Sequence, residues 1–592
     1  MQNIGDFLIS FDSELPHLPS RGSKPWQLVK RFSSSSLYIS AYDDQWHGFP
    51  VGHYQDAKWQ IWALGEFFGS QLPLQLAIEN PDTLNGHFLI FGYNSIEENW
   101  HVITNRSGSM HAYYSDESGH AAFGTYSPAI AAHSGSNKLN WESIYAFFNL
   151  GFFLDDTTYW KDISLFEPAT HTILNKEGRV VSNAKYWHSY YEPNWNLTYG
   201  QAIDRFKEIF EEVLIDQVEG KQIALPLSGG LDSRSTLAVL GSVNKGGATS
   251  LFPYSYGYAD SSPEIKIATD LANSRSLDIR TWTIKPYLFQ DIQRISKCLE
   301  GFQDITQARQ AFVVDDLGIN ATHVVAAHWG DVWLDDMGFL DHPVPNNNLL
   351  SRIILDKYRK NNIGRLPALF SEHFPANIDA LLKSKIEASL GSLDGISEMD
   401  FKVKIWKTEH WSHRWTLASI RMYQSGLFPL LPFYDNRLVD FFCHIPSVYV
   451  QARQLQIDYL KKCAPDLAKI KWQAYDANLF QLKYFNSWLA PYRIYQKAKR
   501  AFSSTPIKQR NWEIQFLTPE GKSNLSTLLL ESASELHSLC DRKKLESLID
   551  DFYDRPGPAL AYCLSMLLTF SSWLKLNMEY NVILGSKTSP NG

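Results

Sequence analysis

The segment of this sequence that most directly indicates chemistry is an apolar run followed by a small polar turn, Ile223-Ala224-Leu225-Pro226-Leu227-Ser228-Gly229-Gly230-Leu231-Asp232-Ser233. The run has the length of a buried strand of a parallel sheet, and we expect a helix after it from Ser233 to Leu240, ended by Gly241. Glycines in the turn let backbone N–H groups approach a ligand closely. The helix start adds unpaired N–H groups and a positive dipole end, so the turn predicts an anion site.

A carboxylate inside an anion site needs a counterion. Asp232 would repel phosphate unless a divalent cation lies between them, and Mg²⁺ usually binds through one or two carboxylates together with phosphates. We therefore expect a Mg²⁺–nucleotide site, with Asp232 both a metal ligand and a catalytic residue. The expected nucleotide contacts in this segment are Pro226, Ser228, Gly229, Gly230, Asp232 and Ser233. An ordinary strand–turn–helix is the alternative, which the fixed order of residue types in the turn disfavours.

Composition limits the class of protein. At 592 residues, with 44% hydrophobic and 20% charged residues, the chain is expected to be globular with two or more domains. A net charge of -8 argues against a sequence-independent nucleic-acid surface. Five scattered cysteines and no secretory signal indicate a cytoplasmic protein. The most apolar segment, Ala559 to Leu574, is interrupted by hydroxyl residues and predicts a buried helix rather than a membrane span.

The pattern of elements changes near residue 190. Residues 1–190 carry short aromatic or β-branched runs separated by turn signals, which predicts a layered sheet domain with few helices. From residue 199 strands alternate with helices, which predicts a parallel sheet with right-handed crossovers. The expected strands of this second part are 223–227, 251–256, 279–284 and 322–327, and its expected helices include 203–214, 264–272 and 288–298.

Ligands of parallel sheets bind beyond the carboxyl ends of the strands. The second expected strand ends at Tyr256-Gly257, and the fourth ends at Ala327-His328-Trp329-Gly330-Asp331, followed by Asp335-Asp336. His328 could be a ligand or a base, although a positioned loop histidine is the commoner case. Further on, Phe401 to Gln424 predicts a helix rich in tryptophan and basic residues, Lys407 among them. A buried aromatic face is the favoured interpretation of that helix, and contact with an anionic or sugar-like substrate is the alternative.

The turn, in the form Leu-Ser-Gly-Gly-Leu-Asp-Ser, resembles the pyrophosphate loop of the asparagine synthetase family within the ATP pyrophosphatase superfamily. Members activate a carboxylate as an acyl-adenylate, release pyrophosphate and let an amine displace AMP. The resemblance implies ATP and Mg²⁺ as cofactors. It also implies an α/β fold in which an Ntn-type layered sheet domain (1–190) precedes a parallel-sheet ATP-pyrophosphatase (adenine nucleotide α-hydrolase-like) domain with a helical C-terminal part (199–592).

The resemblance also implies site residues at the strand ends. Tyr256 and Gly257 would flank the adenine, and His328 would lie at the nucleotide. Asp331 would be the second Mg²⁺ ligand, with Asp335 or Asp336 in reserve. Lys471 would replace a family lysine that neutralises charge on the phosphate in the transition state, because Trp472 to Tyr475 stands where the family has Arg-Pro-Lys. The family's catalytic glutamate corresponds to Phe428 here.

The first 190 residues resemble the family's amidotransferase domain in the strings around Asn85-Gly86, Asn105 and Leu165 to Pro168. Active members use an N-terminal cysteine to hydrolyse glutamine, whereas here Gln2 follows Met1 and the first cysteine is Cys298. A carboxamide cannot replace a thiolate in acyl transfer, so we expect no glutaminase activity. The same loss occurs in β-lactam synthetases and their relatives, which include lasso-peptide cyclases.

Two functions follow from these patterns. The first is an AMP- and pyrophosphate-forming ligase that joins a small-molecule, sugar-acid or peptide carboxylate to an amine. The second is a nucleotide-binding or scaffold protein that has lost catalysis, which Phe428 and Tyr475 favour and the intact loop opposes.

Overall fold

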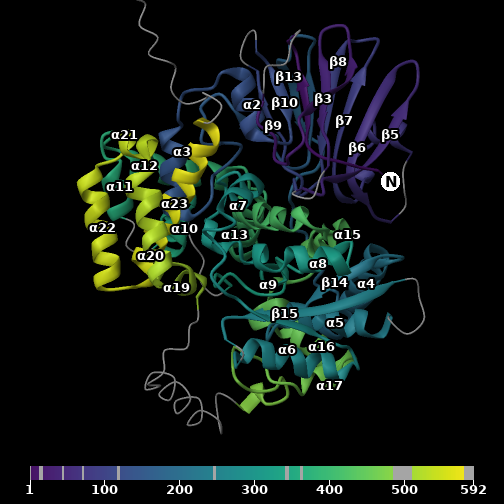
Figure 1. Cartoon of the computed structure of the whole chain (residues 1–592). Coiled ribbons are helices and arrows are strands. Elements are labelled where there is room, and N and C mark those ends of the chain that lie inside the picture. Colours follow the sequence, from purple (N-terminus) through teal and green to yellow (C-terminus); the bar gives the residue numbers. More distant parts are fainter. Residues whose placement is uncertain are drawn as a thin grey trace, which may run out of the picture.

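The computed structural model describes residues 2–12, 18–42, 46–69, 73–116, 120–243, 249–259, 261–340, 346–360, 364–484 and 510–578. The protein is mixed α/β: two antiparallel sheets, one parallel sheet and a group of helices occupy separate regions of the molecule (Figure 1). The layered sheets and the parallel sheet predicted from the sequence are both present.

The two antiparallel sheets form a sandwich. One sheet has the order β1 (Gln2–Ile4), β5 (Phe49–Gln55), β6 (Trp59–Phe67), β7 (Gly86–Asn94), β8 (Asn99–Thr104), β12 (Thr170–Leu174) and β13 (Val180–Lys185). The other has the order β11 (Ser164–Leu165), β9 (Tyr113–Ser115), β10 (Ala122–Gly124), β2 (Phe7–Ser10), β4 (Ser36–Ser40) and β3 (Trp26–Arg31). Phe7 of β2 stacks on Phe91 of β7 with ring centroids 4.0 Å apart, so aromatic side chains fill the space between the sheets.

The parallel sheet has five strands in the order β16 (Arg280–Thr283), β15 (Ser250–Gly257), β14 (Gln222–Pro226), β17 (His323–Val325) and β18 (Phe428–Leu430). Strand β18 was not predicted, because three residues that include Pro429 carry no strand pattern. The chain runs from β14 outward to β15 and β16, then returns to β17 on the other side of β14. The carboxyl ends of β14 and β17 are therefore neighbours where the strand order reverses, which is the usual ligand position in such sheets.

Helices surround the parallel sheet. They are α4 (Tyr199–Val218), α5 (Leu231–Val243), α6 (Pro263–Ser274), α7 (Ile292–Leu299), α8 (Val314–Asn320), α9 (Gly330–Trp333), α15 (Asn436–His444), α16 (Gln454–Cys463) and α17 (Pro465–Ala468). The prediction that the helix after β14 runs from Ser233 to Leu240 and ends at Gly241 was wrong, because α5 begins at Leu231 and continues through Gly241 to Val243. A single glycine weakens a helix without ending it when the helix packs on both sides.

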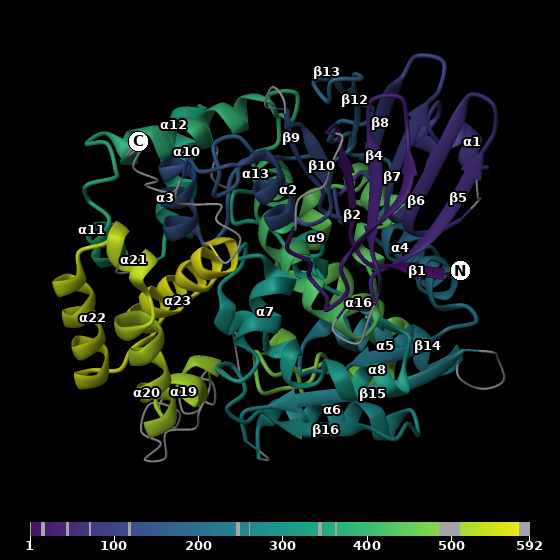
Figure 2. The same ribbon diagram turned by 45° about the horizontal axis from the view of Figure 1, so that its top comes forward.

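A third region is helical. It combines α10 (Asn347–Tyr358), α11 (Arg365–Leu369) and α12 (Ile378–Gly391) with α19 (Asn511–Phe516), α20 (Pro519–Ser526), α21 (Ser534–Leu539), α22 (Arg542–Asp554) and α23 (Pro558–Met578). Helix α3 (Trp141–Leu150), from the first part of the chain, lies among them (Figure 2). Within the described residues, α23 is the one helix long and apolar enough to cross a membrane. Most of its apolar segment is buried against neighbouring helices, as in the core of a globular protein.

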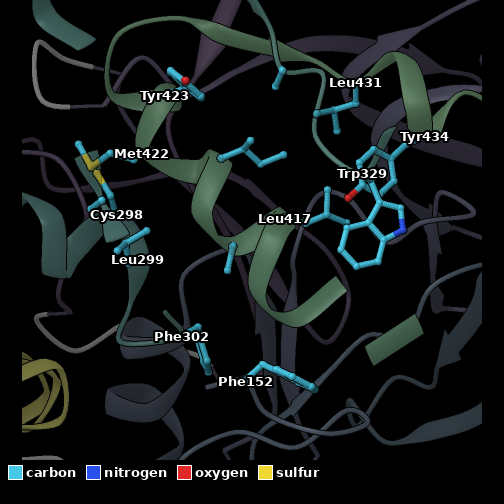
Figure 3. Packing of buried hydrophobic residues seen from close by; sticks show 14 of the residues in the cluster. Phe152, Cys298, Leu299, Phe302, Trp329, Leu417, Met422, Tyr423, Leu431 and Tyr434 are labelled. Carbon is cyan, nitrogen blue, oxygen red and sulfur yellow. The ribbon is translucent and has the colours of Figure 1, made fainter. Parts of the chain in front are cut away.

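A long helical segment connects these regions. It begins as α13 (Met399–Lys407), widens to a π-helix over 408–416, and continues through α14 (Leu417–Ile420) into a 3₁₀ turn that ends at Ser425. Figure 3 shows Met422 of this segment pointing toward Cys298 and Leu299 of α7. The predicted single helix is therefore present with altered winding, which is common where a helix carries functional side chains.

Buried ion pairs attach the sandwich to the rest of the chain. Arg21 Nε lies 3.1 Å from Asp6 Oδ2, and Arg21 Nη2 lies 2.9 Å from Glu300 Oε1. Glu300 also pairs with Arg421 and accepts a 2.7 Å hydrogen bond from the N–H of Ser127. Because each charge has an opposite partner, the desolvation cost of burial is offset within the network.

Candidate active site

The turn after β14 closes on itself through its hydroxyl groups. The N–H of Ser228 donates to Ser233 Oγ (3.2 Å), and the N–H of Gly230 donates to Ser228 Oγ (3.2 Å). Helix α5 begins at Leu231, so Asp232 and Ser233 lie in its first turn, where unpaired backbone N–H groups and the dipole favour an anion. The residues predicted from the sequence to hold phosphate are thus gathered at one helix start.

Gly229 is required by the close approach of a second chain segment. A Cβ at this position would lie 2.5 Å from Gln473 Oε1. The N–H of Gln473 donates to the carbonyl of Gly229 (3.2 Å), and Gln473 Nε2 donates to Glu264 Oε1 (3.2 Å). Gln473 therefore covers the turn and connects it to α6.

The end of β17 meets the turn directly. Trp329 has a left-handed backbone conformation (φ 76°) that redirects the chain into α9 at Gly330. A Cβ on Gly330 would lie 2.9 Å from the carboxyl carbon of Asp232, so only glycine lets the two strand ends come this close. The indole N–H of Trp329 donates to Thr408 Oγ1 (3.0 Å), which fixes this corner against the long helical segment.

A cavity of about 450 Å³ lies between the two strand ends and the helical segment. Its lining consists of Pro226, Ser228, Asp232, Ser233, Ala327, His328, Trp329, Asp331, Val332, Lys407, Trp411, Trp415 and Thr416. Six of the residues proposed from the sequence are in this set: Pro226, Ser228, Asp232, Ser233, His328 and Asp331. The structure thus brings the two expected metal ligands to the same cavity.

Asp232 is the most strongly perturbed acid of the cavity. Burial raises the pKa of its carboxyl group and the charge of Asp331 raises it further, while an ion pair with Arg453 opposes both effects. Asp232 Oδ1 also accepts a hydrogen bond from Gln456 Nε2 (3.1 Å). Asp331 forms no ion pair with any residue that the structure describes.

The two carboxylates fit one hard divalent cation. Within the described ranges, no group of three or more histidine, cysteine or acidic side chains is close enough to hold a metal. Mg²⁺ is commonly held by one or two carboxylates with the remaining ligands from phosphate and water, so Asp232 and Asp331 are a suitable pair. Binding of Mg²⁺ to Asp232 would require the ion pair between Arg453 and Asp232 to break in part.

Lys407 is the cation of the cavity, and the sequence did not single it out. Its Nζ lies 5.1 Å from the ring centroid of Trp411, 5.6 Å from that of Trp329 and 5.7 Å from that of Tyr358. Burial lowers the pKa of Lys407, and the nearby charge of Asp331 partly opposes this shift. Only the spacing of Lys407 and Trp411, one helical turn apart, could have indicated that both face the same ligand.

The end of β15 lies next to the cavity rather than in its lining. A Cβ on Gly257 would lie 2.2 Å from Ser262 Oγ, so the chain itself covers this glycine. Burial lowers the pKa of His328, and the guanidinium charge of Arg309 lowers it further, while Asp331 opposes both. Burial raises the pKa of Tyr256 and the same guanidinium opposes that rise, so its charge acts on both strand ends. Arg309 was not predicted from the sequence.

Lys471 lies outside the lining. Its Nζ pairs with Asp476 (2.9 Å), its side chain is 60% exposed, and its carbonyl accepts a hydrogen bond from Arg234 Nη2 (2.6 Å). The reserve acids are also outside: Asp336 accepts hydrogen bonds from the N–H groups of Gly338 and Ala452, both at 3.0 Å. Asp335 is partly buried, and burial raises its pKa.

The residues that carry the resemblance in the first part of the chain take part in hydrogen bonds within and between regions. Asn85 Oδ1 accepts a hydrogen bond from the N–H of Asn436 (2.9 Å), and Asn105 Nδ2 donates to the carbonyl of Gly86 (2.7 Å). The cavity beside Gly86 measures about 10 Å³, enough for about one water molecule. Phe428 is buried with its ring centroid 5.0 Å from that of His87, away from the larger cavity.

Neither the models of known protein families nor the curated proteins match this chain. Its chemistry is therefore argued from the geometry of the cavity. That geometry combines the start of helix α5, the carboxylates of Asp232 and Asp331 and the ammonium group of Lys407.

Proposed function

We propose that this protein is an ATP-dependent ligase that activates a carboxylate with release of pyrophosphate and transfers it to an amine with release of AMP. The observation that carries the proposal is the meeting of two neighbouring strand ends at the point where the strand order reverses. One end supplies the hydroxyl-rich turn with Asp232, and the other supplies Asp331.

Each part of the cavity has a role in this reaction. The N–H groups of the turn, with Ser228 and Ser233, would bind the β- and γ-phosphates. Asp232 and Asp331 would hold Mg²⁺, which supplies neutralisation of phosphate charge when it is bound. Lys407 would stabilise the negative charge that develops on the phosphates as the substrate carboxylate attacks the α-phosphorus and pyrophosphate leaves. Lys471 remains a second candidate for this last role.

The assignment of the two domains is part of the same proposal. We assign residues 1–190 to an Ntn-type amidotransferase-like domain and residues 199–592 to an ATP-pyrophosphatase domain with a helical C-terminal part. The use of Asn85 in a contact with Asn436, and the space for about one water beside Gly86, support a first domain without glutaminase activity. The substrates would be a small-molecule, sugar-acid or peptide carboxylate and an amine. Five free cysteines support a reducing, cytoplasmic location.

One observation favours a second candidate, a nucleotide-binding or scaffold protein without catalysis. Arg453 pairs with Asp232, the carboxylate that the metal would need. If that pair persists in the presence of nucleotide, the cation site cannot form fully.

Exchange of labelled pyrophosphate into ATP separates the two candidates. The full chain would be incubated with ATP, Mg²⁺ and a panel of carboxylates that includes amino acids and sugar acids. A ligase supports exchange that depends on one class of carboxylate, and Asp232→Asn abolishes it. Asp270→Asn, an exposed acid on α6, is the matched control. Nucleotide binding in calorimetry without any exchange would favour the scaffold, and no binding would exclude both.

A further inference from the structure

A second cavity of about 400 Å³ lies between the sandwich, helix α12 and the long helical segment. It is separate from the candidate active-site cavity. Thr408 lines the second cavity and Trp329 lines the first, and the two side chains are joined by a hydrogen bond. None of the residues assigned a role in the proposed ligase reaction lines it.

One end of this cavity is acidic. Asp155, Asp156 and Glu167 line it together, and the charge of Asp156 contributes to the raised pKa of both other carboxyl groups, for which burial is the larger cause. Among the residues that the structure describes, Asp156 has no ion-pair partner. The like charges of the three carboxylates act on one another, so this end of the cavity favours a positively charged ligand.

The neighbouring cations supply that charge only in part: Lys385 and Arg414 lower the pKa of Asp155, but burial outweighs them and the pKa remains raised. Arg106 pairs with Asp440 (2.9 Å), and Lys385 pairs with Glu142 (3.6 Å). Lys185 lowers the pKa of Glu167 but forms no salt bridge with it in the described part of the chain. The acidic end therefore has more negative than positive charge facing the cavity.

The acidic loop is held in a strained conformation. Asp155 has a positive φ of 55°, which is unfavourable for a residue with a side chain. The buried guanidinium of Arg414 donates to the carbonyls of Asp155 and Thr157, the latter at 2.6 Å. Backbone strain of this kind persists where the surroundings fix it, and here it directs two carboxylates into the cavity.

Two buried imidazoles also line this cavity. Among the described residues, Nε2 of His413, which is 3% exposed, has no hydrogen-bond partner. Nδ1 of His410, which is 7% exposed, has none either and lies 3.7 Å from Asp155 Oδ1, beyond hydrogen-bond distance. Burial lowers the pKa of His410 to about 4 and that of His413 well below its usual range, so both rings are neutral. Buried polar atoms normally have partners, so these nitrogens indicate a missing polar ligand.

The rest of the lining is mixed. Ile405 and Val439, with the rings of Trp187 and Trp333, form its apolar part, and the polar part includes Glu409, which accepts a hydrogen bond from Ser189 Oγ (2.7 Å). We propose that the cavity binds a small aliphatic amine, whose ammonium group lies among Asp155, Asp156 and Glu167 and whose alkyl chain lies along the apolar part of the lining. A bare metal ion fits less well, because no three acidic or histidine side chains in the described ranges are close enough to hold one. This site does not depend on the proposed ligase activity.

Calorimetry on the full chain without nucleotide tests the site, with 1,5-diaminopentane as the probe and 1,5-pentanediol as its neutral analogue. We expect saturable binding of the diamine and none of the diol. Asp156→Asn should weaken diamine binding roughly tenfold or more, because a charge-assisted hydrogen bond is lost. Asp270→Asn should leave it unchanged. Asp156→Asn should also not lower the melting temperature, since it relieves repulsion between like charges.

Glu167→Gln provides a second variant at the other side of the acidic end and should weaken binding to a similar extent. Absence of diamine binding to a folded wild-type chain, equal binding of diol and diamine, or unchanged binding in both variants would each overturn the proposal. Because no ATP is present, none of these results bears on the ligase proposal.

Discussion

The guanidinium of Arg453 lies against the carboxylate of Asp232, which lines the candidate active-site cavity. Arg453 has a left-handed backbone conformation (φ 63°) immediately before α16, and Gln456, one turn later, contacts the same carboxylate. The unfavourable backbone conformation of Arg453 thus places its guanidinium group beside Asp232, the carboxylate that would bind the metal. Arg453 is thus the counterion of Asp232.

Replacing Arg453 should therefore strengthen cation binding. In Arg453→Gln the carboxylate of Asp232 no longer has to release a guanidinium, which is worth about 1 kcal/mol for a partly exposed pair. We expect roughly fivefold tighter binding of Mg²⁺ with a non-hydrolysable ATP analogue in calorimetry. Arg275→Gln, which breaks the more exposed pair with Asp466, is the control. Weaker binding in Arg453→Gln would instead show that this side chain holds the phosphates itself.

Lys407 and Lys471 are the two candidates for stabilising the negative charge that develops on the phosphates in the transition state. Lys407 lines the cavity beside Asp331, whereas Lys471 pairs with Asp476 on the surface. We expect Lys407→Met to lower kcat/KM for pyrophosphate exchange about 100-fold, the scale of losing one transition-state contact, and Lys471→Met to change it less than about threefold. A larger loss in Lys471→Met than in Lys407→Met would assign the catalytic role to Lys471, which follows α17.

The sequence was sufficient where a local string determines a local structure. The turn after β14 and the end of β17 were both selected from residue types, and the sheet brings them together because parallel strands share an edge.

Residues whose role depends on distant packing could not be found in this way. Arg453 and Lys407 come from segments far along the chain, and nothing in their local sequence places them on Asp232 or Asp331. Strand β18 was missed because three residues are too few for a periodic pattern. The winding change within 399–425 likewise follows from tertiary contacts, since its residue types are those of an ordinary helix.

The buried network at Glu300 should dominate the stability of the contact between sandwich and helices. Glu300→Ala leaves the guanidinium groups of Arg21 and Arg421 without their shared acid, which we expect to cost about 3 kcal/mol or more. Chemical denaturation followed by tryptophan fluorescence would measure the loss as an earlier transition. Glu208→Ala, which breaks the exposed pair with Arg205, should change stability by less than about 1 kcal/mol. Equal effects of the two variants would contradict a structural role for the network.

The neutral imidazole of His410 should make the fold sensitive to acid. Because burial lowers its pKa to about 4, the unfolded chain binds a proton between about pH 6.5 and pH 4 that the folded chain does not. Stability therefore falls as the pH is lowered through this window, by on the order of 2 kcal/mol at pH 5 from this one group. His410→Gln should remove that part of the loss, seen as a smaller difference between urea midpoints at pH 7 and pH 5. His188→Gln, at an exposed position, should leave the difference as in the wild type. An unchanged pH dependence in His410→Gln would mean that the imidazole is already protonated, and hence paired with Asp155, when the protein is folded.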